Sequence, residues 1–132
     1  MSTEQTLEVL MRVRSLIAAP EHWLQGQFAV RADGEGCSPQ SPAATRFCLE
    51  GAFWRITGSC DLQEPQLAVL QASGAPSLIA FNDACGHCEV LRAVDAAIEK
   101  YGAARVSATW QKHFGAAMSR AANAVGSDGT RP

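Results

Sequence analysis

Along the first part of the chain, apolar residues recur with the period of an α-helix, and charged or small polar residues fall between them. The repeat begins near Thr3 and continues to Ala19. Pro20 ends it, because proline lacks the backbone N–H that a continuing helix needs. The pattern therefore predicts an amphipathic helix over 3–19 whose buried face consists of Val9, Leu10, Val13, Leu16 and Ile17.

After this helix the pattern weakens and takes the period of a strand. Phe28 and Val30 alternate with polar neighbours, which favours a short strand within 27–32. Asp33-Gly34 is typical of a turn, and the residues from there to Pro42 are rich in glycine, proline and serine. A loop is therefore expected over 33–42.

Ser41-Pro42 combines a side chain that can cap a helix with a proline that fits the first helical position. We therefore expect a second helix from Ser41 to Gly58, a glycine suited to a helix C-terminus. Gly51 lies inside this segment at a cost of about 1 kcal/mol relative to alanine, which favours close approach of another segment. In this interpretation Cys48 lies about two turns into the helix.

The remaining elements follow in quick succession. A short helix is predicted over 66–73, ending at Gly74, and the apolar run 77–81 is either a strand or a buried helical turn. The clearest helix carries an apolar stripe over 90–101 and is expected to end at Gly102. A last amphipathic helix, broken at Gly115, is predicted from the apolar residues Val106, Trp110, Phe114, Ala117 and Met118.

These elements predict a mainly α fold, a compact single domain of about five helices with at most a short strand or hairpin. An α+β fold is the alternative. The chain has 132 residues, enough to bury a core without cross-links. We expect the globular domain to span 1–125 and residues 126–132 to form a flexible tail.

Composition narrows the classes of function. The net charge is -2, whereas general nucleic-acid binders carry a clear basic excess, so no nucleic-acid partner is expected. Charged residues make up 18% of the chain, below the roughly 25% of typical domains, which favours a surface covered by another protein. The N-terminus lacks the pattern of a secretory signal, and no apolar run reaches the ~18 residues of a membrane span. We therefore expect a cytoplasmic protein with reduced thiols.

The motif Cys85-Gly86-His87-Cys88 places two thiols at a helix start, where they can form a redox-active pair. It resembles the active site of thioredoxin-like disulfide oxidoreductases. Its surroundings differ, because no proline follows until Pro132 and the remaining chain is too short for the rest of that fold. Zinc binding is a weaker alternative, since a second paired half-site is missing, and neither a metal nor another cofactor is expected.

Cys48 offers a third chemistry, as a nucleophile with His87 as base and Asp83 as orienting acid. A reactive cysteine normally lies at a helix N-terminus, where its pKa falls. Because Cys48 is predicted to lie inside a helix, packing near Gly51 is the favoured interpretation. No catalytic residue is assigned, and the candidates are Cys85, Cys88, Cys48 and His87.

Polar residues from separate segments form the candidate binding site: Trp23, Gln25, Arg46, Asn82 and Asp83. Arginine can bind a carboxylate through two hydrogen bonds, and Asn-Asp in a turn can cap the following helix. The favoured interpretation is an internal Arg46–Asp83 ion pair that ties two loops to the second helix. The alternative is a small recognition cleft around the same side chains.

The order of short motifs resembles a family of small bacterial and phage proteins of unknown function. The resemblance covers roughly 7–101. Its principal motifs are Trp23-x-Gln25-Gly26, Arg46-x-Cys48-x-x-Gly51-Ala52, Asn82-Asp83 and Asp95-x-Ala97-Ile98. The chain departs from the family at Leu24, where relatives often carry cysteine, and at the dithiol motif, so the dithiol is expected to be local to this chain.

The sequence thus favours a non-catalytic domain that binds another protein, with a homodimer as a further option. The resemblance implies an accessory or anti-defence factor of a phage or other mobile element, and it supplies no activity to carry over. A thiol–disulfide oxidoreductase that uses Cys85 and Cys88 is the alternative.

Overall fold

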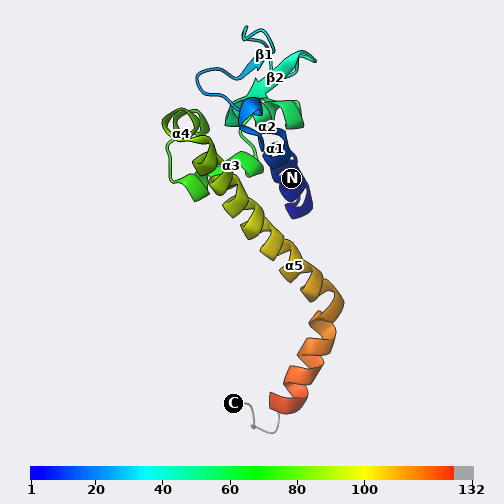
Figure 1. Ribbon diagram of the computed structural model, residues 1–132. Helices are drawn as coiled ribbons and strands as arrows, with labels where there is room; N and C mark the ends of the chain where they lie inside the picture. The colour runs from blue at the N-terminus through cyan, green and yellow to red at the C-terminus, as the bar shows by residue number, and fades with distance from the viewer. Residues whose placement is uncertain (127–132) are drawn as a thin grey trace.

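The computed structural model describes residues 1–126, together with the side chains of all of these except 108, 109 and 112–126. Figure 1 shows a globular body from which one long helix projects. The fold is mainly α, with five α-helices and one small two-stranded antiparallel sheet among the described residues, as the sequence predicts.

The chain begins with α1 (Thr3–Leu16), which is shorter than the predicted 3–19. Ser2 caps it in a capping box, accepting a hydrogen bond from the Gln5 backbone while the Gln5 side chain accepts one from the Ser2 backbone. Pro20 begins a short 3₁₀ turn, η1 (Pro20–His22). The helix therefore ends before the chain reaches the proline.

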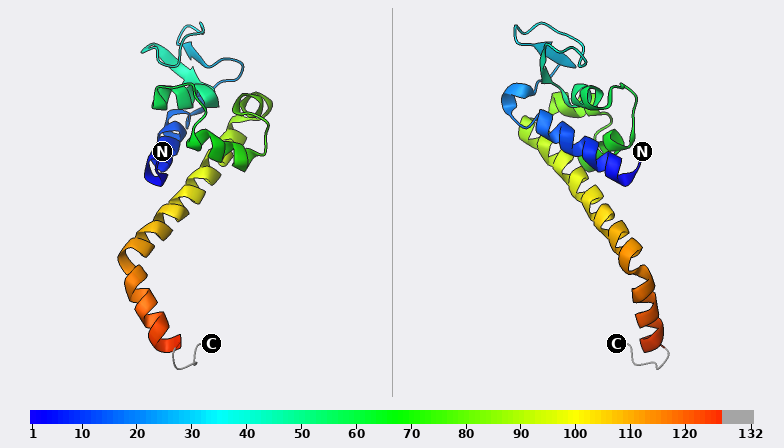
Figure 2. Two further views of the ribbon diagram at one scale, coloured as in Figure 1. Left: turned by 180° about the vertical axis from the view of Figure 1, so that it is seen from behind. Right: turned by 90° about the vertical axis from the view of Figure 1, so that its right-hand side faces the viewer.

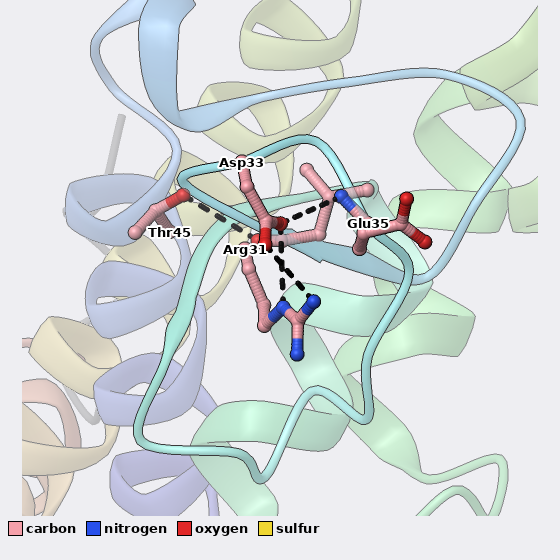
Figure 3. Close-up of polar contacts among 5 residues, drawn as sticks. Arg31, Asp33, Glu35 and Thr45 are labelled. Atoms are coloured by element: carbon pink, nitrogen blue, oxygen red, sulfur yellow. Dashed lines mark hydrogen bonds and ion pairs between the residues drawn. The ribbon is translucent and has the colours of Figure 1, made fainter.

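The predicted strand is confirmed as β1 (Ala29–Arg31), which pairs in antiparallel fashion with β2 (Ala44–Phe47). The predicted turn follows β1 (Figure 3). There Asp33 accepts hydrogen bonds from the Glu35 backbone N–H at 2.9 Å and from Arg31 at 2.9 Å. These donors lower the pKa of the Asp33 carboxyl, the backbone N–H contributing most.

The predicted helix from Ser41 to Gly58 is wrong in its first half. Residues 44–47 form β2, and α2 (Leu49–Thr57) begins only after Cys48, which is its N-cap. Residues 44–47 form a strand because their backbone groups hydrogen-bond to β1. A local capping signal contains no information about this distant partner. The predicted end is correct, because Gly58 closes α2 in the left-handed conformation.

Two short helices precede the projecting one. The predicted helix near 66–73 is confirmed as α3 (Glu64–Ser73), with Gly74 as its C-cap. The apolar run at 77–81 belongs to α4 (Leu78–Ala84), capped by Ser77, so the helical alternative is the correct one. α4 buries Leu78, Phe81 and Asn82 and leaves Ile79 and Asp83 exposed.

The two helices predicted around Gly102 are one element, α5 (His87–Gly126). Gly102 does not adopt the positive φ of a helix C-cap, and the alanines that follow it favour continued helix. The predicted break at Gly115 is also absent from the backbone. Side chains that the sequence placed on the last helix, Phe114, Ala117 and Met118, lie outside the described ones, as does most of the predicted tail.

The first half of α5 packs on α1 and α3, and the core lies between these helices and α2. Leu10, Phe53, Val69, Val90 and Val94 are fully buried there. The later part of α5 extends away from the body, as all three views show (Figures 1 and 2). No helix in the described part of the chain is long and apolar enough to cross a membrane.

Candidate functional site

Four of the predicted polar residues meet where η1, the start of α2 and the end of α4 come together. At the centre is Asn82, which is fully buried. Its Oδ1 accepts hydrogen bonds from Trp23 Nε1 at 2.7 Å and from the Leu49 backbone N–H at 3.0 Å. Its Nδ2 donates to the Leu24 carbonyl oxygen at 3.0 Å. One amide side chain therefore joins three chain segments.

Gln25 and Asp83 extend this arrangement outwards. Gln25 Nε2 donates to the carbonyl oxygens of Asn82 at 3.0 Å and Cys85 at 2.8 Å. Asp83 Oδ1 accepts from the Gly26 backbone N–H at 3.0 Å and from Asn82 Nδ2 at 3.3 Å. We call Trp23, Gln25, Asn82 and Asp83, with these partners, the Asn82 network.

Four of the five predicted binding residues thus lie together, and Arg46 does not. Arg46 is exposed on β2, and no ion pair joins it to Asp83, so the predicted Arg46–Asp83 pair is wrong. The physical reason is the strand: neighbouring residues of a strand point to opposite faces, and the buried Phe47 leaves Arg46 on the outer face. The tie between segments that the pair was expected to provide is supplied by Asn82.

Cys48 lies next to this network as the N-cap of α2, where its Sγ accepts a hydrogen bond from the Gly51 N–H at 3.3 Å. This corrects the prediction that it lies two turns inside a helix. Burial nevertheless raises the pKa of the Cys48 thiol, and the carboxylates of Glu50 and Asp83 act in the same direction. The position is that of a reactive cysteine, but the environment keeps the thiol protonated.

A small pocket of about 160 Å³ opens beside Cys48. We call it the Cys48 pocket; it is lined by Gly26, Gln27, Phe28, Cys48, Ile79 and Asp83. Phe28 and Ile79 are unusually exposed for apolar side chains, at 42% and 46%. A larger open groove, of about 810 Å³, follows α1 and contains none of the predicted site residues.

The dithiol motif lies at the junction of two helices, since Cys85 is the C-cap of α4 and α5 begins at His87. Partial burial and the neighbouring Glu89 carboxylate raise the pKa of the Cys85 thiol. Both effects oppose the low-pKa thiolate that a redox-active pair needs. Cys88 is exposed, and all five cysteines are free thiols.

The His87 side chain contacts Ile17 and Trp23 and no cysteine thiol among the described residues. Its Nε2 lies 2.6 Å from the Ile17 carbonyl oxygen, which can only accept, so Nε2 carries the proton and donates. Its ring also packs against Trp23, with centroids 5.3 Å apart. The predicted use of His87 as a base for Cys48 finds no contact to support it. Among the side chains that can be described, no group of three metal-ligating residues lies together.

The two large apolar residues of the Cys48 pocket, Phe28 and Ile79, were not among the predicted site residues. Phe28 was assigned only to a strand, and Ile79 only to an apolar run. Placing 78–84 on a helix separates Leu78 and Asn82 on its buried face from Ile79 and Asp83 on its outer face. That separation was the available signal, but it required choosing the helical alternative first.

Comparison with known proteins identifies a family. A model of a family of unknown function, DUF6197, matches residues 1–100, which include the body and the packed first half of α5. No curated protein and no solved structure matches the chain.

Proposed function

The chain belongs to DUF6197, a family of unknown function, and we propose that it is a non-catalytic module that binds another protein through the part of α5 beyond the body. The observation that carries this proposal is the projection of α5. Where it packs on α3, Lys100 of α5 donates a hydrogen bond to Gln71 and Tyr101 donates one to Glu64. Beyond them, Val106 is 64% exposed and Trp110 is 49% exposed.

A helix in water draws most of its stability from packing of an apolar face rather than from its own hydrogen bonds. A projecting helix with exposed large apolar side chains therefore gains stability when another protein covers that face. Covering a side chain such as Val106 contributes about 1.5 kcal/mol or more of binding free energy. The low charged fraction of the chain supports the same conclusion.

The body supports a non-catalytic role. The Asn82 side chain directs both of its polar atoms to partners within the fold, and His87 Nε2 is bound to a backbone carbonyl. The pKa values of Cys48 and Cys85 are both raised, which disfavours nucleophilic and redox chemistry at neutral pH. The oxidoreductase alternative therefore has less support than protein binding. An accessory or anti-defence role is narrower, and the identity of the captured partner tests it.

Val106→Glu tests the proposal with Leu62→Glu as its matched control. Leu62 is an exposed apolar residue like Val106, with 59% of its surface accessible. It differs in its position, because it lies on the body just before α3. We expect the full-length protein to co-purify with a partner at native expression in its host. Val106→Glu should weaken that interaction by about tenfold or more, and Leu62→Glu should leave it unchanged.

Light scattering of the purified protein distinguishes a partner of another kind from a second copy of this chain. A dimer that Val106→Glu converts to a monomer identifies the second copy as the partner. Absence of any partner in repeated captures, together with a monomer in solution, contradicts the proposal. Equal loss of binding in the two variants contradicts the assignment to α5.

A further inference from the structure

We propose that the Cys48 pocket receives a single lysine side chain of a partner protein, with the ammonium group at Asp83 and the alkyl chain between Phe28 and Ile79. The inference rests on the proposed protein-binding function, but it concerns the body and not the projecting part of α5. Its residues belong to the segment 26–28 before β1, to the N-cap of α2 and to α4. Hydrogen bonds from Gly26 to Asp83 and from Cys48 to Phe28 connect these segments.

The size and walls of the pocket suit one extended apolar chain. Its volume of about 160 Å³ is close to that of cavities that hold one benzene-sized group. Phe28 makes an edge contact with Trp54, the ring centroids being 5.8 Å apart. Ile79 and Asp83 lie four residues apart on α4 and therefore share its outer face. The Cys48 thiol, a small apolar group when protonated, lines the same space.

The charge of the pocket selects a cation. Asp83 is the only charged residue in its lining, and neither of the ion pairs between described side chains includes it. No described lysine or arginine thus neutralises this carboxylate by direct contact.

The hydrogen bonds of Asp83 favour lysine over arginine. Asp83 Oδ1 already accepts from Gly26 N–H and Asn82 Nδ2. Oδ2 accepts from none of the described donors and remains for a ligand. Arginine binds best when its planar fork meets both oxygens of a carboxylate, whereas an ammonium group is a compact charge that needs only one.

The test is a titration of the isotope-labelled full chain followed by nuclear magnetic resonance. The probes are Nα-acetyl-lysine N-methylamide, its norleucine analogue without the ammonium group, its arginine analogue, and putrescine. We expect the lysine probe to shift the amide signals of Gly26 and Asp83 with millimolar affinity. The affinity of the norleucine analogue should be at least about tenfold lower.

Variants connect the binding to the pocket. Asp83→Asn keeps an oxygen for the Gly26 N–H, so it should fold normally and bind the lysine probe about tenfold more weakly. Asp61→Asn, at an exposed acid elsewhere on the body, should bind as the natural chain does, and so should Val106→Glu. Ile79→Ser should weaken binding by removing one wall.

Several results would overturn the inference. Failure of the lysine probe to shift these signals, equal binding of the lysine and norleucine probes, or unchanged binding by Asp83→Asn would each do so. If the arginine probe bound more tightly than the lysine probe, the partner residue would be an arginine. If putrescine bound more tightly than the lysine probe, the ligand would be a free polyamine and not a protein. Because the projecting helix is tested separately by Val106→Glu, either proposal can fail without the other.

Discussion

Asn82→Ala is expected to lower the free energy of unfolding by about 4 kcal/mol, since it leaves several buried groups without partners at about 1–3 kcal/mol each. The groups affected are Trp23 Nε1, the Leu49 N–H and the Leu24 carbonyl oxygen. Trp23 and Leu24 belong to the segment after η1 and Leu49 begins α2, so Asn82 joins both of these segments to α4. Urea unfolding followed by circular dichroism measures the effect.

Gln25→Ala is the comparison for this prediction. Gln25 also donates two hydrogen bonds to backbone carbonyls, but its side chain is exposed, so water can replace it. A loss of about 1 kcal/mol is expected. Asn82 would not be the centre of the network if Asn82→Ala lowered the free energy of unfolding no more than Gln25→Ala does. The comparison requires that both variants keep the same slope of this free energy against urea concentration.

Gly51→Ala is expected to destabilise the fold by about 3 kcal/mol, the upper part of the range for overpacking a core. A Cβ atom at this position would overlap the Phe28 carbonyl oxygen and crowd the Phe28 carbonyl carbon at 2.8 Å. Both atoms are backbone, and Phe28 O also accepts the Cys48 N–H, so neither can move without breaking this contact. The substitution would push Phe28, the residue before β1, away from the start of α2.

Gly102→Ala is the matched control, because Gly102 is also a helix glycine. A Cβ at Gly102 would have nothing within 4 Å, so the higher helix propensity of alanine should stabilise the chain by about 1 kcal/mol. Differential scanning calorimetry of the two variants should give opposite shifts of the melting temperature. Shifts of the same sign would contradict the close approach at Gly51.

The parts of the fold that follow from local signals could be predicted. Helical periodicity located α1 and the first part of α5, and glycine caps located the ends of α2 and α3. The glycine at position 51 correctly indicated that another segment approaches closely. Each of these signals acts within a few residues, so the sequence alone contains it.

The errors arose where distant residues decide the structure. Ser41-Pro42 has the signature of a helix start, but pairing with β1 makes 44–47 a strand. Cysteine is not among the preferred N-cap residues, so Cys48 gave no sign of its position. Gly102 resembled a helix end, yet only a residue that adopts positive φ provides that cap.

The candidate site was predictable in its members but not in its chemistry. The structure brings Trp23, Gln25, Asn82 and Asp83 together, but the sequence grouped them around an Arg46–Asp83 ion pair that does not form. The sequence could not show that Asn82 would be central and Arg46 outside, since both depend on the register of β2 and on the burial of α4.

Thiol reactivity in the folded protein tests most directly whether this body is non-catalytic. Brief alkylation near neutral pH, read residue by residue by mass spectrometry, compares each cysteine with the exposed Cys60. We expect Cys48 and Cys85 to react several-fold more slowly than Cys60, because the pKa of each thiol is raised, and Cys48 to react readily only after unfolding. Faster reaction of either Cys48 or Cys85 than of Cys60 in the folded chain would contradict the non-catalytic account.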